Sequence, residues 1–522
     1  MKIYNKIIIY SSFLLIFSIC INQYYGYRGV FPIDSFLFFD SGFRVLNGYF
    51  PFKDFWAVTG LTVDIIQALF FKIFGVSWFS YVLHASFLNF LIAFATFYTL
   101  YKFELNINFC FLYALLISII AYPISGTPFP DHHSIIFSLF ALFCFILHLK
   151  TNLNLYLFLL PIFLVLAFLS KQTPAAYIFL IILTIGLIYF IFNFSIKKIL
   201  FLSLGTFFII IIFGSFFLIN EIPFSSFYEQ YILFPLTIGN SRISEFLFPI
   251  EFNRLVTRFK LIHLSQLLLI IIIFKNVFKN YKYLISNDFF IQISLILTSW
   301  ILIIHQLLTL NQKFVFFIIP VLLGFSHVYF KNYKKNYFIY FLIILGVGSS
   351  LYYKISYGDT RKFMELTDVN FKNSINAEII DPKLKNLKWI NPNYLGSSKD
   401  EADLLKKTID ILKKDNRNKI LITHYQFIAS LLPYPVSSPN RTYTDDSISY
   451  PKLNDQYFEN YKKFFINQII DKEIKIIYVI KPLEENVFTF LLNQNCIESQ
   501  KINSILNSYI IIDCMQLKKR ED

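Results

Sequence analysis

Residues 199–219 read ILFLSLGTFFIIIIFGSFFLI, an apolar run that contains no ionisable side chain. A helix needs about 20 apolar residues to cross the hydrocarbon core of a bilayer, so this run predicts a transmembrane helix. Ten further stretches of similar character lie at 5–22, 79–101, 107–123, 134–150, 154–170, 175–194, 261–279, 288–308, 314–330 and 336–353. We therefore expect a polytopic α-helical membrane protein with about 11 transmembrane helices.

The composition agrees with a protein that lives in a bilayer. Of the 522 residues 56% are hydrophobic, including 65 Phe and 34 Tyr, which is more than a soluble core of this length requires. The formal charge of +14 is divided among small groups between apolar runs, a pattern that argues against a nucleic-acid-binding patch. The first run follows Lys2 and Lys6 like a signal sequence, but no small-residue cleavage site follows it, so we expect an uncleaved first span.

Charge placement predicts the orientation. Segment 58–75 is apolar but carries Asp64, Gln67 and Lys72, which are costly in hydrocarbon, and it is therefore expected to be interfacial or re-entrant. With that assignment the short loops on one side hold only Lys171 and Lys313 as basic residues. The lysine-rich opposite side, with the amino terminus, is then cytoplasmic. The predicted location is the inner (plasma) membrane, with the carboxyl-terminal tail periplasmic or otherwise external.

From Lys354 onward the sequence turns polar. The run SSKDEADLLKKTIDILKK predicts a helix opened by a capping box of Ser398 and Glu401, with Leu405, Ile409 and Leu412 on its buried face. Strands are expected at 419–423 and 475–480, and a helix-like run at 484–494.

The expected organisation is a transmembrane catalytic domain at 1–353, with an external loop at 23–78, and a soluble α/β domain at 354–522. Cysteines 20, 110 and 144 lie in or at apolar runs, where a thiol behaves as a small hydrophobe. Cys496 and Cys514 lie in the tail, where an external location permits a disulfide between them.

Three carboxylates lie in the loop after the first span, at Asp34, Asp40 and Asp54. A solvated interfacial loop is the simpler interpretation for Asp40 and Asp54, with a supporting acidic role as the alternative. Asp34 follows the first span closely and opens an amphipathic segment. A carboxylate at the water boundary can act as general base toward an acceptor hydroxyl.

The same loop resembles the first external loop of GT-C glycosyltransferases, the group that contains protein O-mannosyltransferases and aminoarabinose transferases. The resemblance is carried by Asp34, Gly48, the run YFPFKDFW at 49–56 and the ending IFGVSW at 73–78, with Ser35 where that group commonly has a Glu. It implies a sugar donor linked to a polyprenyl phosphate, transfer at the outer face of the membrane and inversion at the anomeric carbon.

The next external loop reads GTPFPDHHS at 126–134, and the resemblance implies a second acidic motif there. Asp131 is therefore a candidate catalytic residue, with a helix-capping role as the equal alternative. His132 is a further candidate site residue. His132 and His133 are adjacent and their side chains diverge on a helix, so we predict no metal site, and the need for a divalent metal stays open.

Basic residues on the predicted external side need anionic partners. We expect these residues to bind the donor phosphate, with Gln312 nearby, and lipid headgroups are the alternative partner. The candidates are Lys171, Lys313, Arg242, Arg254 and Arg258.

The predicted function is thus a glycosyltransferase that moves a sugar from a lipid-linked donor to a glycan, lipid or protein acceptor, in contact with membrane lipids and without nucleic acid. A lipid or polysaccharide transporter without chemistry is the alternative from another class. Such proteins concentrate polar groups at mid-membrane and show repeats, neither of which is visible in this sequence. An O-antigen polymerase or ligase, which would use arginines in the loop at 220–260, is the alternative enzyme.

Overall fold

The computed structural model describes residues 3–243, 251–309, 314–330, 337–434, 436–444 and 448–512. The chain forms two compact units. The helical unit comprises Met1–Tyr27, Val82–Phe216 and Arg242–Thr367, and the mixed unit comprises Arg28–Tyr81, Phe217–Ser241 and Asp368–Asp522. The first external loop therefore packs with the carboxyl-terminal residues, a grouping that the sequence did not predict.

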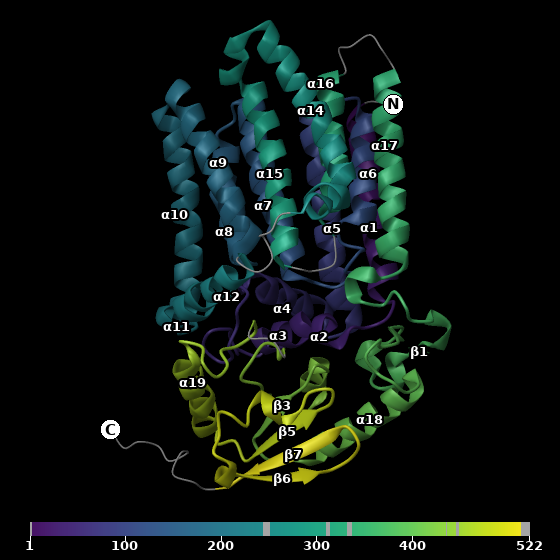
Figure 1. Ribbon diagram of the computed structural model, residues 1–522, viewed down its shortest axis with the longest axis vertical. Coiled ribbons are helices and arrows are strands. Elements are labelled where there is room, and N and C mark those ends of the chain that lie inside the picture. The colour runs from purple at the N-terminus through teal and green to yellow at the C-terminus, as the bar shows by residue number, and fades with distance from the viewer. Residues whose placement is uncertain are drawn as a thin grey trace. The chain divides into compact units, whose positions relative to one another are not determined.

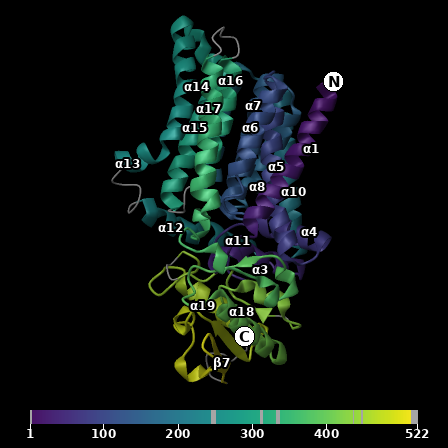
Figure 2. The ribbon, with the colours of Figure 1, turned by 90° about the vertical axis from the view of Figure 1, so that its right-hand side faces the viewer.

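Helices of the helical unit lie side by side (Figures 1 and 2). They are α1 (Ile3–Gly26), α5 (Trp78–Lys102), α6 (Ile107–Ile120), α7 (Pro130–Thr151), α8 (Leu155–Phe168), α9 (Gln172–Phe192), α10 (Ile196–Ile219), α14 (Lys260–Lys279), α15 (Asn287–Thr309), α16 (Ile318–Phe330) and α17 (Tyr337–Tyr353). Each expected apolar range falls on one of these helices. Among the described residues, eight helices are long and apolar enough to cross a membrane, and three apolar helices are shorter. The mostly helical membrane class is confirmed, whereas the count of 11 and the orientation stay predictions.

Helix α7 forms the interior of the helical unit. Its apolar window is 89% buried, against 11% for α10, because α7 packs against α8, α9 and α15. A helix that is apolar all round and enclosed by other helices is a core helix, whereas the open surface of α10 suits contact with lipid. The start of α7 is therefore held by neighbours on several sides.

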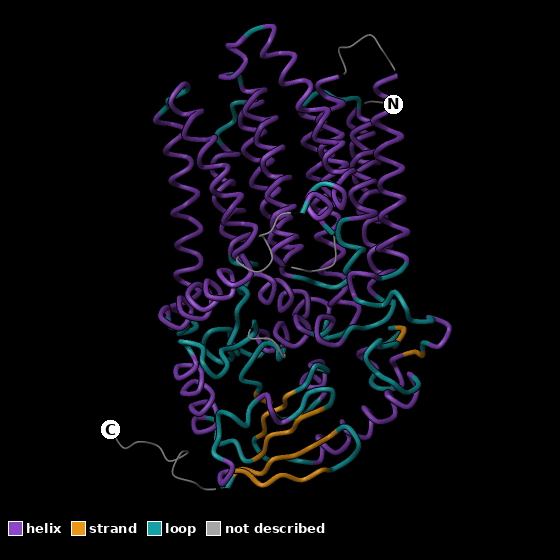
Figure 3. The backbone as a smooth tube through the Cα atoms, in the orientation of Figure 1, coloured by secondary structure: helices purple, strands orange, loops and turns teal. Residues whose placement is uncertain are grey.

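The mixed unit contains a five-stranded sheet in the order β4-β3-β5-β7-β6, drawn in orange in Figure 3. Strands β4 (Val436–Ser437), β3 (Lys419–Ile422) and β5 (Ile476–Ile480) run parallel, and β7 (Leu506–Ile511) and β6 (Ile497–Lys501) continue the sheet antiparallel. Strands were expected at both β3 and β5, and every residue of each is buried. Helices α18 (Ser398–Lys414) and α19 (Phe458–Asp471) complete this part, and β1 (Ile375–Asn376) pairs with β2 (Lys388–Trp389).

Two local expectations in the tail were wrong. The capping box of α18 is formed by Ser397 and Asp400, one residue earlier than expected. Glu401 instead points inward and accepts hydrogen bonds from Trp389, Asn391 and Tyr425 at 2.7–2.8 Å. Burial raises the pKa of Glu401, because no cation lies among these hydrogen-bond partners to offset the lost hydration.

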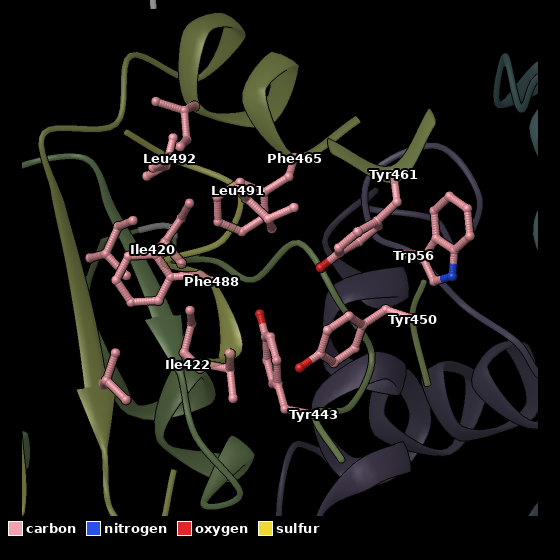
Figure 4. Close-up of a cluster of buried hydrophobic side chains, with 14 of the residues drawn as sticks. Trp56, Ile420, Ile422, Tyr443, Tyr450, Tyr461, Phe465, Phe488, Leu491 and Leu492 are labelled. Carbon is pink, nitrogen blue, oxygen red and sulfur yellow. The ribbon is translucent and has the colours of Figure 1, made fainter. Parts of the chain in front are cut away.

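The run 484–494 is not a regular helix. It contains a short 3-10 turn at Glu485–Val487, and Phe488 then leaves helical geometry with φ −142° and ψ −16°. Its apolar side chains Phe488, Leu491 and Leu492 nevertheless enter the buried cluster of the sheet (Figure 4). An irregular buried segment and a helix present the same apolar spacing in sequence, so the pattern alone could not separate them.

The first external loop shares this hydrophobic cluster. Trp56 packs edge-on against Tyr461 at 5.2 Å between ring centroids (Figure 4). Its backbone amide donates to the carbonyl of Pro439 at 2.7 Å, and its own carbonyl accepts from Arg441 at 2.9 Å. Main-chain pairing and aromatic packing thus join the loop to residues almost 400 positions later in the chain.

The loop folds as α2 (Pro32–Ser35), α3 (Leu37–Leu46) and α4 (Thr62–Phe74). At about 1.5 Å per residue the 13 residues of α4 are too short to span a bilayer. Its polar Asp64 and Gln67 are buried within the mixed unit, whereas Leu69 and Ile73 are 52% and 62% exposed. An exposed apolar face is the pattern of an interfacial helix, and the position of segment 58–75 at the membrane stays a prediction.

Candidate functional site

Asp131 lies at the centre of a buried charge cluster in the helical unit. It occupies the first turn of α7 directly after Pro130 and is 1% exposed. The Lys171 ammonium donates to both of its carboxylate oxygens at 2.8 Å. The imidazole Nε2 of His305 lies 2.9 Å from Oδ1. From the sequence, Asp131 was a candidate catalytic residue and Lys171 a candidate phosphate ligand with no link between them. The structure shows that the two side chains are in contact.

Three helix ends position these groups. Lys171 is the residue before α9 and has an extended backbone, and its carbonyl accepts a hydrogen bond from Ser134 on α7 at 3.0 Å. His305 lies in the last turns of α15. Asp131 sits at the amino terminus of α7, where the helix dipole favours a negative charge. The Lys171 side chain is 19% exposed while those of Asp131 and His305 are 1% and 0%, so the cluster is accessible at its lysine.

Arg242 adds a second positive charge. It ends α12 (Phe234–Arg242), and both it and Lys171 lie within electrostatic range of His305. Lys171 and Arg242 outweigh the single carboxylate of Asp131 when His305 is neutral. Buried or half-buried cations of this kind suit an anionic ligand.

The other predicted cations are placed differently. Arg254 is half-buried in α13 (Phe252–Leu255), and Arg258 is exposed in the short turn Thr257–Phe259, where its charge acts on Tyr357. Lys313 and Gln312 lie outside the described residues, as does Cys514 of the expected disulfide.

His132 and His133 diverge, as two adjacent helical residues must. His132 is buried and stacks on Phe314 at 4.4 Å between ring centroids. His133 instead contacts Tyr122 Oη at 2.6 Å and His84 Nε2 at 2.8 Å. Among the described residues, no group of three or more His, Cys, Asp or Glu side chains is arranged to hold a metal ion.

Arg361 fixes the loop that leads into α7. Its side chain is 1% exposed, and its guanidinium donates to the carbonyls of Pro123, Ile124 and Ser125 at 2.9–3.2 Å. Three carbonyls held by one buried cation restrict the backbone just before Asp131. In the sequence, Arg361 resembles an ordinary interfacial charge because it is a lone arginine after an apolar span. Its role was therefore not predicted.

The acidic residues of the first loop have distinct environments in the mixed unit. Asp40 is buried and pairs with Arg44 at 2.5 Å. Burial raises the pKa of Asp40, and the Arg44 guanidinium opposes that shift. The Asp54 carboxylate accepts the backbone N–H of Phe50 at 2.8 Å and so stabilises a turn. Asp34 lies in the first turn of α2 and is half-buried.

A second buried pair, Asp64 with Arg441, was not predicted as a site. The guanidinium of Arg441 donates to Asp64 at 2.5 Å and to the carbonyl of Thr59 at 2.7 Å. Ser41 also donates to Asp64. Burial raises the pKa of Asp64, and the positive charge of Arg441 acts in the opposite direction. Within the mixed unit, this pair fastens the acidic loop to the carboxyl-terminal residues.

No protein-family model and no curated protein matches the chain. Among solved structures, the chain is similar to the Archaeoglobus fulgidus oligosaccharyltransferase tethered with an acceptor peptide, at 11% identity and a TM-score of 0.40, over 90% of this chain and 69% of that chain. It is also similar to ArnT from Cupriavidus metallidurans bound to undecaprenyl phosphate, at 8% identity and a TM-score of 0.44, over 98% of both chains.

At these identities and TM-scores, the reaction and the residues have to be argued from the side chains of this chain itself.

Proposed function

We propose that this protein is a GT-C-type glycosyltransferase that moves a sugar from a polyprenyl-phosphate-linked donor to an acceptor at the outer face of the inner membrane. The observation that supports it most is the cluster of Asp131, Lys171 and His305, with Arg242 in range. Ionisable groups gathered at the ends of apolar helices are expensive in a membrane protein and are retained for function.

The chemistry requires cations at a phosphate. A polyprenyl phosphate is the leaving group, and negative charge develops on its oxygens as the bond to the sugar breaks. Lys171 and Arg242 are the described cations that would stabilise this charge. Lys171 is also bound by Asp131, so the phosphate shares the ammonium with that carboxylate, which keeps Lys171 in place. Arg254, Arg258 and Lys313, with Gln312, remain proposed as further donor contacts.

The acceptor needs a base. In the proposed step the acceptor O–H bond breaks and its proton passes to the Asp34 carboxylate, while the acceptor oxygen bonds to the anomeric carbon. The bond from that carbon to the phosphate oxygen breaks, and its electron pair leaves with the phosphate. Direct displacement inverts the anomeric centre. The Asp40 carboxylate binds Arg44 and the Asp54 carboxylate accepts the amide of Phe50, so these two are proposed as supporting acidic residues of the same loop.

The test is transfer by the purified full-length protein. A panel of radiolabelled prenyl-phosphate sugars is incubated with membrane acceptors, and the fate of the label is followed. We expect labelled acceptor and free prenyl phosphate in equal amounts. A transporter would leave the label on its donor and change only the side of a vesicle on which it is found. Elongation of a lipid-linked glycan by repeat units would favour the polymerase alternative.

A further inference from the structure

Among the residues that the structure describes, one ring nitrogen of His305 has a hydrogen-bond partner and the other has none. Its Nε2 lies 2.9 Å from Oδ1 of Asp131. Its Nδ1 is buried and has no hydrogen-bond partner among the described residues. The side chain as a whole is fully buried in the helical unit.

The partner of Nε2 determines what Nδ1 can do. The Asp131 carboxylate also binds the Lys171 ammonium through both oxygens, which is the bonding of an ionised carboxylate. An ionised carboxylate only accepts hydrogen bonds, so Nε2 carries the hydrogen. The neutral imidazole, the main form at pH 7 for an ordinary histidine, then presents a lone pair at Nδ1. Asp131 thereby fixes an acceptor of known direction.

An unmet acceptor in this position is costly. A buried polar atom without a partner loses its hydration with nothing to replace it, and most native structures avoid this. The backbone of His305 is anchored as well, since its carbonyl accepts a hydrogen bond from Thr309 at 3.0 Å. The next residue, Gln306, accepts the amide of Phe314 at 3.0 Å. The ring is therefore held from both its side chain and its backbone with Nδ1 unmet.

The neighbouring groups indicate the ligand. Lys171 Nζ and His305 Nε2 bond the same oxygen, Oδ1 of Asp131, so the ammonium and the imidazole lie within about two hydrogen-bond lengths of each other. A donor phosphate bound by Lys171, as proposed, would bring its sugar substituent into the same part of the helical unit as His305. Sugars next to a phosphate offer hydroxyl groups, which are hydrogen-bond donors of the kind that Nδ1 lacks.

We infer that His305 is a specificity residue whose Nδ1 accepts a hydrogen bond from a hydroxyl of the transferred sugar. The inference rests on the proposed function and deepens it, because it requires a donor whose sugar has a free hydroxyl close to its phosphate linkage. Asp131 is then a positioning residue for His305 as well as the partner of Lys171.

Two substitutions separate this role from a purely structural one. His305→Asn keeps a polar oxygen near the Nδ1 position and loses the contact with Asp131. His305→Gln reaches the Nε2 position, so it keeps the contact with Asp131 and loses the acceptor at Nδ1. The control is His327→Gln, which changes another buried histidine, paired with Tyr113 at 3.2 Å. Melting temperature in detergent checks the folding of each variant.

The measurement is kcat/KM with the complete donor and with donors that lack one hydroxyl each. In the parent, one deoxy donor should lose about tenfold to hundredfold, the scale of an unmet buried acceptor. His305→Gln should lose a similar factor with the complete donor and show no further loss with that deoxy donor. His305→Asn should still prefer the complete donor over that deoxy donor, but by a smaller factor than the parent.

The inference would be overturned if His305→Gln kept the parental kcat/KM and still distinguished the complete donor from the deoxy donor. It would also be overturned if only His305→Asn lost kcat/KM. If neither variant folds, the deoxy series with the parent decides, and equal rates with all deoxy donors overturn it. These failures leave transfer by the parent intact. Absence of transfer by the parent with every donor is the separate failure of the proposed function.

Discussion

The ammonium of Lys171 lies 2.8 Å from each carboxylate oxygen of Asp131. Sequence alone presented Lys171 as an isolated cation on the side of the membrane where lysines are rare. In the structure, Lys171 is paired with Asp131. Substitution of the lysine and substitution of the aspartate should therefore have opposite effects on binding of the donor phosphate. Removing the lysine removes the proposed phosphate ligand, whereas neutralising the aspartate would leave the lysine free to bind the phosphate.

We therefore expect Lys171→Met to weaken binding of a radiolabelled prenyl phosphate by about tenfold or more, the scale of a lost charge-assisted hydrogen bond. Asp131→Asn should leave the affinity unchanged or raise it, while lowering turnover. Equilibrium binding to protein in detergent measures both. A decrease of the same size in the two variants would assign the pair to folding rather than to the donor.

The buried pair of Arg441 and Asp64 should dominate the stability of the mixed unit. Arg441→Met leaves Asp64 buried without its cation, which typically costs about 3–5 kcal/mol. The matched control is Lys53→Met, since Lys53 pairs at 3.2 Å with an 83% exposed Glu221 and such surface pairs contribute at most about 1 kcal/mol. Thermal unfolding in detergent should show a large decrease for Arg441→Met and a small one for the control. Equal melting temperatures would contradict the role given to this pair.

Lys472 provides a pH-dependent prediction. Burial, with the nearby Arg44, lowers the pKa of Lys472 to about 8, and Asp54 acts in the opposite direction. The unfolded chain has a lysine pKa near ~10.4, so between these values the folded state binds fewer protons. Stability then rises with pH across that window.

Melting temperatures of the parent and of Lys472→Met, measured from pH 7 to pH 10, test this. The parent should gain stability relative to the variant as the pH rises through 8. Parallel curves would show that Lys472 is as well hydrated in the folded protein as in the unfolded chain.

The orientation is tested with reporters. Fusions after Asp522 and in the loop near Asp131 should both report a location outside the cytoplasm, because lysines favour the cytoplasmic side. A cytoplasmic signal from the carboxyl-terminal fusion would mean an odd number of crossings has been added or removed. Segment 58–75 is the first place to look, although α4 is short.

The spans could be predicted from sequence because the bilayer sets their length and excludes charge from them. The buried face of α18 could also be predicted, and Leu405, Ile409 and Leu412 are buried as expected. Ion pairs between residues far apart in the chain could not be predicted from the sequence. Asp131 and Lys171 are 40 positions apart, and Asp64 and Arg441 are 377 positions apart. No periodicity links such residues, so only the packing of the helices and the sheet shows that they meet.

His305 illustrates the same limit at the candidate site. His305 lies inside an apolar run of the sequence, and no local pattern there points to Asp131. The direction of its ring nitrogens depends on a contact across 174 positions. The sequence analysis therefore missed His305, and only its contact with Asp131 in the structure identifies it.

The most direct test of the account compares the parent with Asp34→Asn for transfer of a radiolabelled sugar at saturating prenyl-phosphate donor. The amide keeps the shape of the side chain and cannot take the acceptor's proton, so transfer should fall by about a hundredfold or more. Folding and donor binding should be near parental, with Asp40→Asn and Asp54→Asn as comparisons in the same loop. Labelled acceptor should form with the parent and be almost absent with Asp34→Asn. Near-parental transfer by Asp34→Asn would contradict Asp34 as the base, and no labelled acceptor from the parent itself would contradict glycosyl transfer.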